Sequence, residues 1–142
     1  MKMKPIFFMF CIFAAVCLSG CREENDETAI LDAESVEKEP IHGTEGKFEI
    51  VKVNGSSDEP PFPVGEGRHY EVYFLDDTAD MNGKKYRMTA IYKETEETVD
   101  LYEAVINNNR SGAKFALGKA GIWKIEVTVD EEPFTRFDIE AE

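Results

Sequence analysis

Cys21 stands in a setting where a thiol can be chemically modified. It follows a positive start at Met1-Lys2-Met3-Lys4, an uncharged apolar run over residues 6–16, and the segment Leu18-Ser19-Gly20. This order of charged, apolar and small-residue regions is typical of a secretory signal peptide, here over residues 1–20. The apolar run is shorter than the roughly 20 residues that span a bilayer as a helix. We therefore expect export and cleavage, with an uncleaved anchor over residues 5–21 as the alternative.

The tetrapeptide Leu18-Ser19-Gly20-Cys21 resembles a bacterial lipobox. The resemblance implies that the Cys21 sulfur is acylated, as in palmitate-bearing lipoproteins, and that the chain is then cut before Cys21. A diacylglyceryl group would supply the additional acyl chain that stable membrane binding requires. Cys11 and Cys17 lie in the presumed signal, so we expect one cysteine and no disulfide in the mature chain. The expected location is the cell membrane, with the chain lipid-anchored on its extracytoplasmic face.

The carboxylates of Asp76, Asp77 and Asp80 are the second group that could do chemistry. Their segment, Asp76-Asp77-Thr78-Ala79-Asp80-Met81-Asn82-Gly83, is similar to a calcium loop. Aligning Asp80 and Asn82-Gly83 at their ligand positions, however, puts Thr89 where a bidentate Glu belongs. The pattern favours a solvated turn, with these three aspartates as weak candidates for calcium.

Catalysis and copper binding have less support. Nucleophilic catalysis needs an activated Ser, Thr or Cys beside a base, and the histidines available are His42 and His69. The serines Ser56, Ser57 and Ser111 lie in no nucleophile motif and are expected in turns. Copper needs clustered His, Cys or Met ligands, whereas His69, Met81 and Met88 are dispersed. We predict no enzymatic activity and no cofactor.

The elements that would position these groups begin after an acidic stretch. Residues 22–46 carry nine carboxylates and two basic side chains, with no sustained apolar face. High charge with little to bury favours disorder, so residues 21–46 are expected to form a lipidated, disordered tether. A short helix over residues 28–38 is the alternative.

Residues 47–142 are enough for one domain. They carry 20 acidic and 12 basic side chains, a net charge of −8. Such a surface repels nucleic acid, whose affinity for proteins comes largely from Lys and Arg on phosphate. Nucleic-acid binding is therefore excluded.

Apolar residues alternate with polar ones along most of this domain. Trp123, Ile125, Val127 and Val129 are separated by single residues, and the alternation resumes at Phe137 after Asp130-Glu131-Glu132-Pro133, which predicts a C-terminal hairpin. Further strands are expected over residues 48–53, 70–74, 86–92, 98–106 and 113–117. Asn54-Gly55 and Asn82-Gly83 are typical of tight hairpin turns.

About seven short strands and no convincing helix predict an all-β fold, an immunoglobulin-like antiparallel β-sandwich over residues 47–142. Trp123 is then expected in the core, because Ile125 and Val127 share its face of the strand. A ligand-stacking role for Trp123 is the alternative.

Several short motifs resemble a family of Gram-positive bacterial lipoproteins whose single immunoglobulin-like domain has no assigned function. They are Pro61-Phe62-Pro63, Asn82-Gly83-Lys84-Lys85, Lys93-Glu94-Thr95 and Gly121-Ile122-Trp123-Lys124. Family members carry tryptophans in the strand where this chain has Tyr70 and Tyr73. The resemblance implies a membrane-anchored surface protein of Gram-positive cells.

Two functions follow from these expectations. The first is a non-enzymatic extracellular interaction module that contacts an envelope protein or the cell wall. The alternative is an envelope protein that binds a small ligand or a metal ion, calcium or copper, through the Asp76–Asp80 loop or through exposed Tyr70 or Tyr73.

Overall fold

Eight strands form the part of the protein that the computed structural model describes, residues 41–142. The predicted signal peptide, the lipid attachment at Cys21 and the tether up to residue 40 lie outside the described residues. Within residues 41–142 no helix has the length and apolar character to cross a membrane.

The C-terminal hairpin illustrates why the strands form. In β7 (Gly121–Val129) the side chains of Trp123, Ile125, Val127 and Val129 are buried, and those between them face outward. β7 pairs antiparallel with β8 (Glu132–Ala141), where Ile139 and Ala141 are buried in the same way. The predicted hairpin is thus confirmed. Its turn is shorter than expected, because only Asp130 and Glu131 lie outside the strands.

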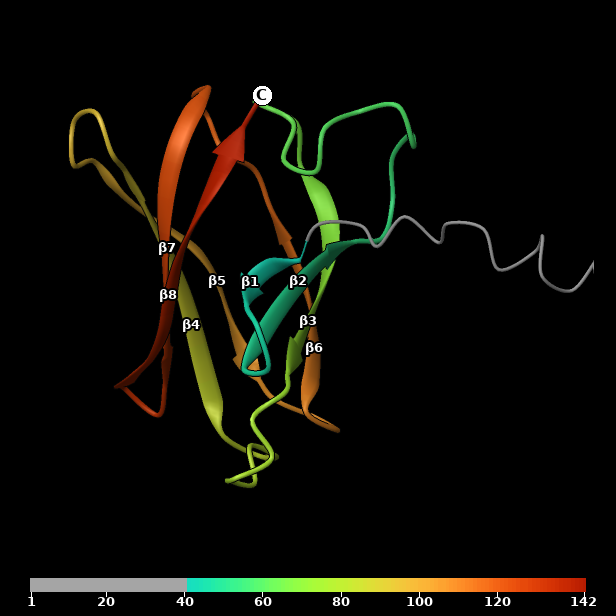
Figure 1. The fold of residues 1–142 in the computed structure, drawn as a ribbon, viewed down its shortest axis with the longest axis vertical. Coiled ribbons are helices and arrows are strands. Elements are labelled where there is room, and N and C mark those ends of the chain that lie inside the picture. The colour runs from blue at the N-terminus through green and yellow to red at the C-terminus, as the bar shows by residue number, and fades with distance from the viewer. Residues whose placement is uncertain (1–40) are drawn as a thin grey trace, which may run out of the picture. The chain divides into compact units, whose positions relative to one another are not determined.

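The strands form two antiparallel sheets of four that face each other (Figure 1). One sheet has the order β1 (His42–Thr44), β2 (Phe48–Lys52), β3 (Arg68–Phe74), β6 (Arg110–Phe115). The other has the order β5 (Thr98–Val105), β4 (Lys85–Tyr92), β7, β8. The chain crosses between sheets after β3, β5 and β6. This arrangement confirms the immunoglobulin-like sandwich.

Aromatic side chains fill the space between the sheets. Phe48 lies edge-on to Phe74, with ring centroids 5.2 Å apart, and Phe74 lies edge-on to Tyr86 at the same separation. Trp123 is 2% exposed, and its Nε1 donates to the Lys119 carbonyl at 2.9 Å. Trp123 is therefore a core residue, as expected, and not a stacking platform.

The domain begins earlier than the predicted boundary at Lys47. β1 pairs antiparallel with β2, in register from His42 opposite Ile50 to Thr44 opposite Phe48. The His42 ring also lies edge-on to Phe62, with centroids 5.0 Å apart. The sequence His-Gly-Thr has no apolar alternation, so pairing with β2 rather than a local pattern makes this segment a strand. The prediction that residues 42–46 belong to a disordered tether was wrong.

Neither Asn-Gly pair closes a tight hairpin. Gly55 and Gly83 do have positive φ angles of 97° and 80°, as the sequence suggested. However, residues 53–67 form one long connection between β2 and β3, and residues 75–84 carry the chain to the other sheet. Both asparagine side chains anchor these loops, because Asn54 Oδ1 accepts from the His69 N–H and Asn82 Oδ1 from the Asn109 N–H.

A Gly43→Ala substitution is expected to release β1 and to cost about 1–3 kcal/mol of stability. A β-carbon at Gly43 would lie 2.0 Å from the Phe48 carbonyl oxygen, and the φ angle of 150° is unfavourable for alanine. Urea unfolding and amide exchange of β1 and β2 would measure the effect. Gly118→Ala is the matched control, because no atom lies within 4 Å of its added β-carbon. Equal stability of the two variants would contradict the prediction.

Candidate functional site

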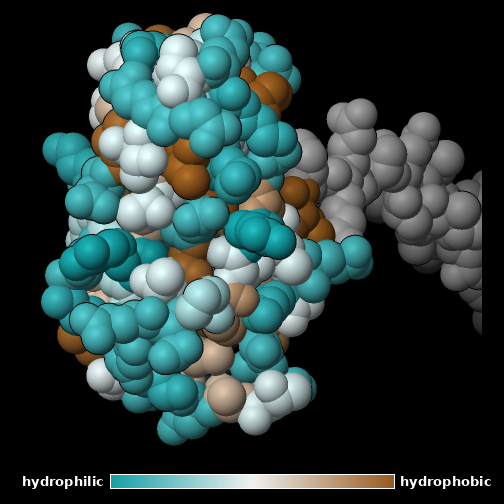
Figure 2. Space-filling model, turned by 90° about the vertical axis from the view of Figure 1, so that its left-hand side faces the viewer, coloured by the Kyte–Doolittle hydropathy of each residue, from teal (hydrophilic) through white to brown (hydrophobic). Residues whose placement is uncertain are grey.

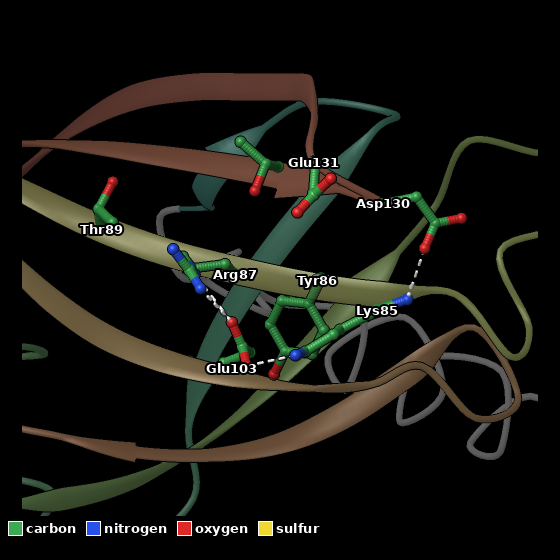
Figure 3. A pocket seen from close by; sticks show the side chains of 8 residues that line it. Lys85, Tyr86, Arg87, Thr89, Glu103, Asp130 and Glu131 are labelled. Carbon is green, nitrogen blue, oxygen red and sulfur yellow. Dashed lines mark hydrogen bonds and ion pairs between the residues drawn. The ribbon is translucent and has the colours of Figure 1, made fainter.

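A shallow groove of about 650 Å³ lies on the outer face of the β5-β4-β7-β8 sheet (Figure 3). Successive strand residues alternate between faces, so burial of Tyr86, Met88 and Ala90 turns the residues between them outward. The groove is lined by Lys85, Tyr86, Arg87 and Thr89 of β4, Glu103 of β5, Thr128 of β7 and the turn residues Asp130 and Glu131.

The charged side chains of the groove pair with one another. Glu103 accepts from Lys85 Nζ at 2.6 Å through one oxygen, and Arg87 approaches the other at 2.7 and 2.8 Å. The hydrogen bonds from Lys85 and Arg87 hold the pKa of Glu103 below its usual value, and Glu103 raises the pKa of Arg87. The site is therefore an ordered arrangement of opposite charges before anything binds.

The turn at Asp130 and Glu131 forms the opposite side of the groove from Glu103 (Figure 3). Both residues have positive φ angles, 49° and 70°, although neither is glycine or asparagine. Two hydrogen bonds to the Lys85 backbone stabilise the Asp130 conformation. Asp130 Oδ1 accepts from the Lys85 N–H at 3.0 Å, and the Asp130 N–H donates to the Lys85 carbonyl at 2.7 Å. The backbone of β4 thus holds the acidic turn beside Lys85 and Arg87.

Chemically, this groove can contact a charged or polar surface. Figure 2, which views the side on which β4, β7 and β8 lie in Figure 1, shows a mainly hydrophilic face with scattered apolar residues. Sequence reasoning missed the groove. The alternation in β4 turns Lys85, Arg87 and Thr89 outward, but the register that places Glu103 opposite Arg87 cannot be derived from it.

Asp76, Asp77 and Asp80, the calcium candidates, do not form a ligand set. Asp76 Oδ1 accepts from the N–H and hydroxyl of Thr78, which lowers the pKa of Asp76. Asp80 Oδ1 accepts in the same way from the N–H and side-chain amide of Asn82. Within residues 41–142 no three His, Cys, Asp or Glu side chains come close enough to hold a metal ion. Asp76 and Asp80 stabilise local turns.

Tyr70 and Tyr73, the candidate ligand-binding aromatics, lie on opposite faces of β3. Tyr70 is 3% exposed, stacks on Phe115 at 4.3 Å and donates its hydroxyl to the Pro61 carbonyl. Burial raises the pKa of Tyr70 to about 12. The prediction that Tyr70 is exposed was therefore wrong, because Tyr70 shares the inner face of β3 with Val72. Tyr73 is half-buried on the outer face, where its hydroxyl donates to Glu71 at 2.8 Å.

His69 and the two methionines considered for copper binding lie in different surroundings. His69 is exposed on β3, and its ring makes no hydrogen bond within the described part of the chain. Ser111 lies in β6 rather than in a turn, which corrects the expectation from sequence. Met81 and Met88 are core residues, 5% and 0% exposed.

A partly exposed ion cluster holds the long loop between β2 and β3. The Glu59 carboxylate pairs with Lys52 Nζ at 2.9 Å and accepts two hydrogen bonds from the Arg68 guanidinium at 2.8 and 2.7 Å. Arg68 also pairs with Glu66. Arg68 and Lys52 lower the pKa of Glu59 to about 2. These partners are joined through an irregular loop, so no periodic pattern in the sequence indicated the cluster.

Acid is expected to remove the stabilisation that Glu59 provides. The pKa of Glu59 falls on folding from 4.5 to about 2. Its contribution to the stability of the fold is therefore complete above the pKa of the unfolded chain, and it is lost as the pH falls through the pKa of the folded chain. The Tm difference between wild type and Glu59→Gln should therefore be largest above about pH 5 and shrink as the pH falls from there to about 2. Thermal unfolding at several pH values would measure it. Glu140→Gln, which removes an exposed carboxylate without an ion pair in the described residues, is the control; a constant Glu59→Gln difference would contradict the prediction.

Comparison with known proteins shows the fold. No protein-family model matches the chain, and no curated protein matches it. An X-ray crystal structure described as a "Putative Lipoprotein from Bacillus anthracis" is 22% identical, with a TM-score of 0.58, and the match covers 75% of this chain and 80% of that one. The Lin-41 filamin domain is 15% identical with a TM-score of 0.46, over 71% of this chain and 98% of that domain.

Proposed function

We propose that this chain is a cell-membrane lipoprotein, anchored through lipid on Cys21, whose β-sandwich acts outside the cytoplasm as a non-enzymatic interaction module. Its partner is an envelope protein or the cell wall. The groove on the β5-β4-β7-β8 sheet is its contact surface.

The anchoring part rests on sequence. Leu18-Ser19-Gly20-Cys21 follows a signal-like apolar run and resembles a lipobox. The Bacillus anthracis chain with the same fold is described as a "Putative Lipoprotein". Both support the same anchor, with the domain carried behind an acidic stretch.

The paired charges of the groove carry the interaction part. Lys85 and Arg87 are held between Glu103 on one side and the Asp130-Glu131 turn on the other (Figure 3). Charges held in fixed positions favour partners whose charges are complementary and disfavour partners that bring like charges together. The groove is open and contains no activated nucleophile beside a base, which suits recognition of a surface rather than turnover of a substrate.

Site-specific photo-crosslinking in intact cells tests this proposal. A photoreactive residue at Thr89, inside the groove, is expected to capture an envelope component reproducibly. The same residue at Glu49, on the outer face of the other sheet, is the matched control. Charge reversal at Arg87 should reduce capture from Thr89. If Thr89 captured nothing beyond the Glu49 control, the proposed interaction module would be abandoned.

A further inference from the structure

The four strands at the edges of the two sheets differ in how far they are covered. β8 is covered at both ends: Thr44 of β1 bonds Thr135 through their hydroxyls at 2.7 Å, and Glu142 exchanges backbone bonds with the segment at Phe62 and Val64. β1 has three residues, and β6 has six with Gly112 among them. β5 packs against β6 of the other sheet. It has eight residues, contains neither proline nor glycine, and within residues 41–142 has no strand hydrogen-bonded to its outer side. Uncovered edge strands can pair with another chain.

The backbone of β5 has free hydrogen-bonding groups on its outer side. In antiparallel pairs, residues bonded to the neighbouring strand alternate with residues whose N–H and C=O point away. Ile106 donates to Lys84, and Glu97 accepts from Tyr92, so both ends of β5 are bonded toward β4. Counting inward from these ends places the outward groups on Thr98, Asp100, Glu103 and Val105, on either side of the bulge at Leu101. Within the described residues none of these four N–H groups bonds to another element.

The side chains of β5 show what an added strand would need. Asp100 and Glu103 face the groove side of the sheet, beside Thr89 and Arg87. Val99 and Tyr102 face the core side, yet Val99 is 36% exposed and Tyr102 is half-buried because they lie at the open edge. An added strand would place alternate residues beside the acids and the others beside this apolar surface.

The charge at this edge selects the partner. Residues 94–105 contain five acidic side chains and no basic one. An antiparallel pairing of β5 with β5 of a second copy would therefore oppose acids with acids or with neutral residues in any register within this segment, and like charges opposite one another are destabilising. Glu103 is already paired with Lys85 and Arg87, and Glu97 with Lys119. Asp100 has no ion pair among the described residues, so a strand with a basic residue facing Asp100 has the complementary charge.

We propose that β5 is a docking edge for an extended segment of a partner protein in which basic and apolar residues alternate. The segment adds a fifth strand to the β5-β4-β7-β8 sheet, with its basic side chains at the rim of the groove and its apolar side chains against Val99 and Tyr102. This inference rests on the proposed interaction module and names its partner class.

Peptide binding to the full chain, extracted from membranes in detergent, tests the inference. The probe is a fluorescently labelled eight-residue peptide of alternating lysine and valine. Fluorescence anisotropy measures its binding, and amide exchange shows whether β5 is protected. We expect binding that slows exchange over residues 98–105 and no binding of the matching glutamate–valine peptide. Asp100→Lys should weaken binding by about fivefold or more. Glu140→Lys, the same reversal on covered β8, should leave it unchanged.

Thr98→Pro tests the backbone contribution, because it removes one outward N–H without removing a bond to β4. It should weaken binding even though the charge is unchanged. Equal losses in Asp100→Lys and Glu140→Lys, equal binding of the glutamate peptide, or unaltered exchange over β5 would each overturn the docking edge. So would a β5-mediated dimer in light scattering. If the peptide tests fail while a photoreactive residue at Thr89 still captures an envelope component, the interaction module stands without the β5 docking edge. If the peptide binds but the residue at Thr89 captures nothing, the interaction module fails instead.

Discussion

A Trp123→Ala protein is expected to lose about 3–5 kcal/mol of unfolding free energy. Trp123 is 2% exposed, its ring lies 4.9 Å from that of Tyr92, and it stands opposite Ile139 in the β7–β8 pair. Truncation leaves a cavity between the sheets and removes the bond from Nε1 to the Lys119 carbonyl. Since domains of this size are stable by only about 5–15 kcal/mol, the variant should be close to unfolding.

Urea unfolding followed by far-ultraviolet circular dichroism would measure this loss, because the variant has no other tryptophan to report by fluorescence. Ile122→Ala is the matched control. Ile122 is the neighbouring residue of the same strand, faces outward and is 36% exposed, so its truncation should cost much less. Trp123→Phe separates the two contributions, since it keeps most of the volume and loses the hydrogen bond. Similar midpoints for Trp123→Ala and Ile122→Ala would show that Trp123 does not anchor the core.

A Cys21→Ala protein is expected to lose its lipid completely. The alanine has no sulfur to acylate. The resemblance to a lipobox implies that cleavage before residue 21 takes place only after acylation, so cleavage is expected to fail as well. Stable anchoring requires more than one acyl chain, so the variant should keep membrane association only if its uncleaved apolar run remains inserted. Intact mass of the membrane-extracted protein is the measurement.

Wild type should give the mass of a chain that starts at Cys21 and carries acyl groups, and Cys21→Ala should give an unmodified chain. Ser19→Ala is the control, because it preserves a small residue before the cysteine and should leave the modification intact. A wild-type mass that corresponds to an unmodified Met1 start would contradict the anchor. The fold would be unaffected, because residues 41–142 form the sandwich.

Local alternation explains which strands could be predicted. The apolar residues at 123, 125, 127 and 129, and those at 86, 88, 90 and 92, all lie on the inner face. A strand buried on one face shows this pattern whatever its neighbours are. β1 was missed because His42, Gly43 and Thr44 show no such pattern. The expected exposure of Tyr70 was wrong because Tyr70 belongs to the same inner-face alternation as Val72 and Phe74, where it stacks on Phe62 and Phe115.

The groove and the ion clusters could not be predicted for a related reason. Arg87 meets Glu103 through the register of β4 and β5, 16 residues apart, and Lys85 meets Asp130 across 45 residues. The chain has 29 acidic and 16 basic side chains, so very many pairs are conceivable, and only tertiary packing selects among them.

The amino-acid sequence by itself determined the class of fold and the expectation of a lipid anchor at Cys21. Both depend on short stretches whose periodicity or order is meaningful alone: alternation for strands, and the charged, apolar and small-residue order for the signal. The tertiary structure decided that the chain enters the sandwich at β1, which carboxylates are paired, and that the outer backbone groups of β5 have no strand partner within the described residues. Those properties depend on which strand edges meet in space, and antiparallel pairing joins residues whose separation along the chain carries no local signal.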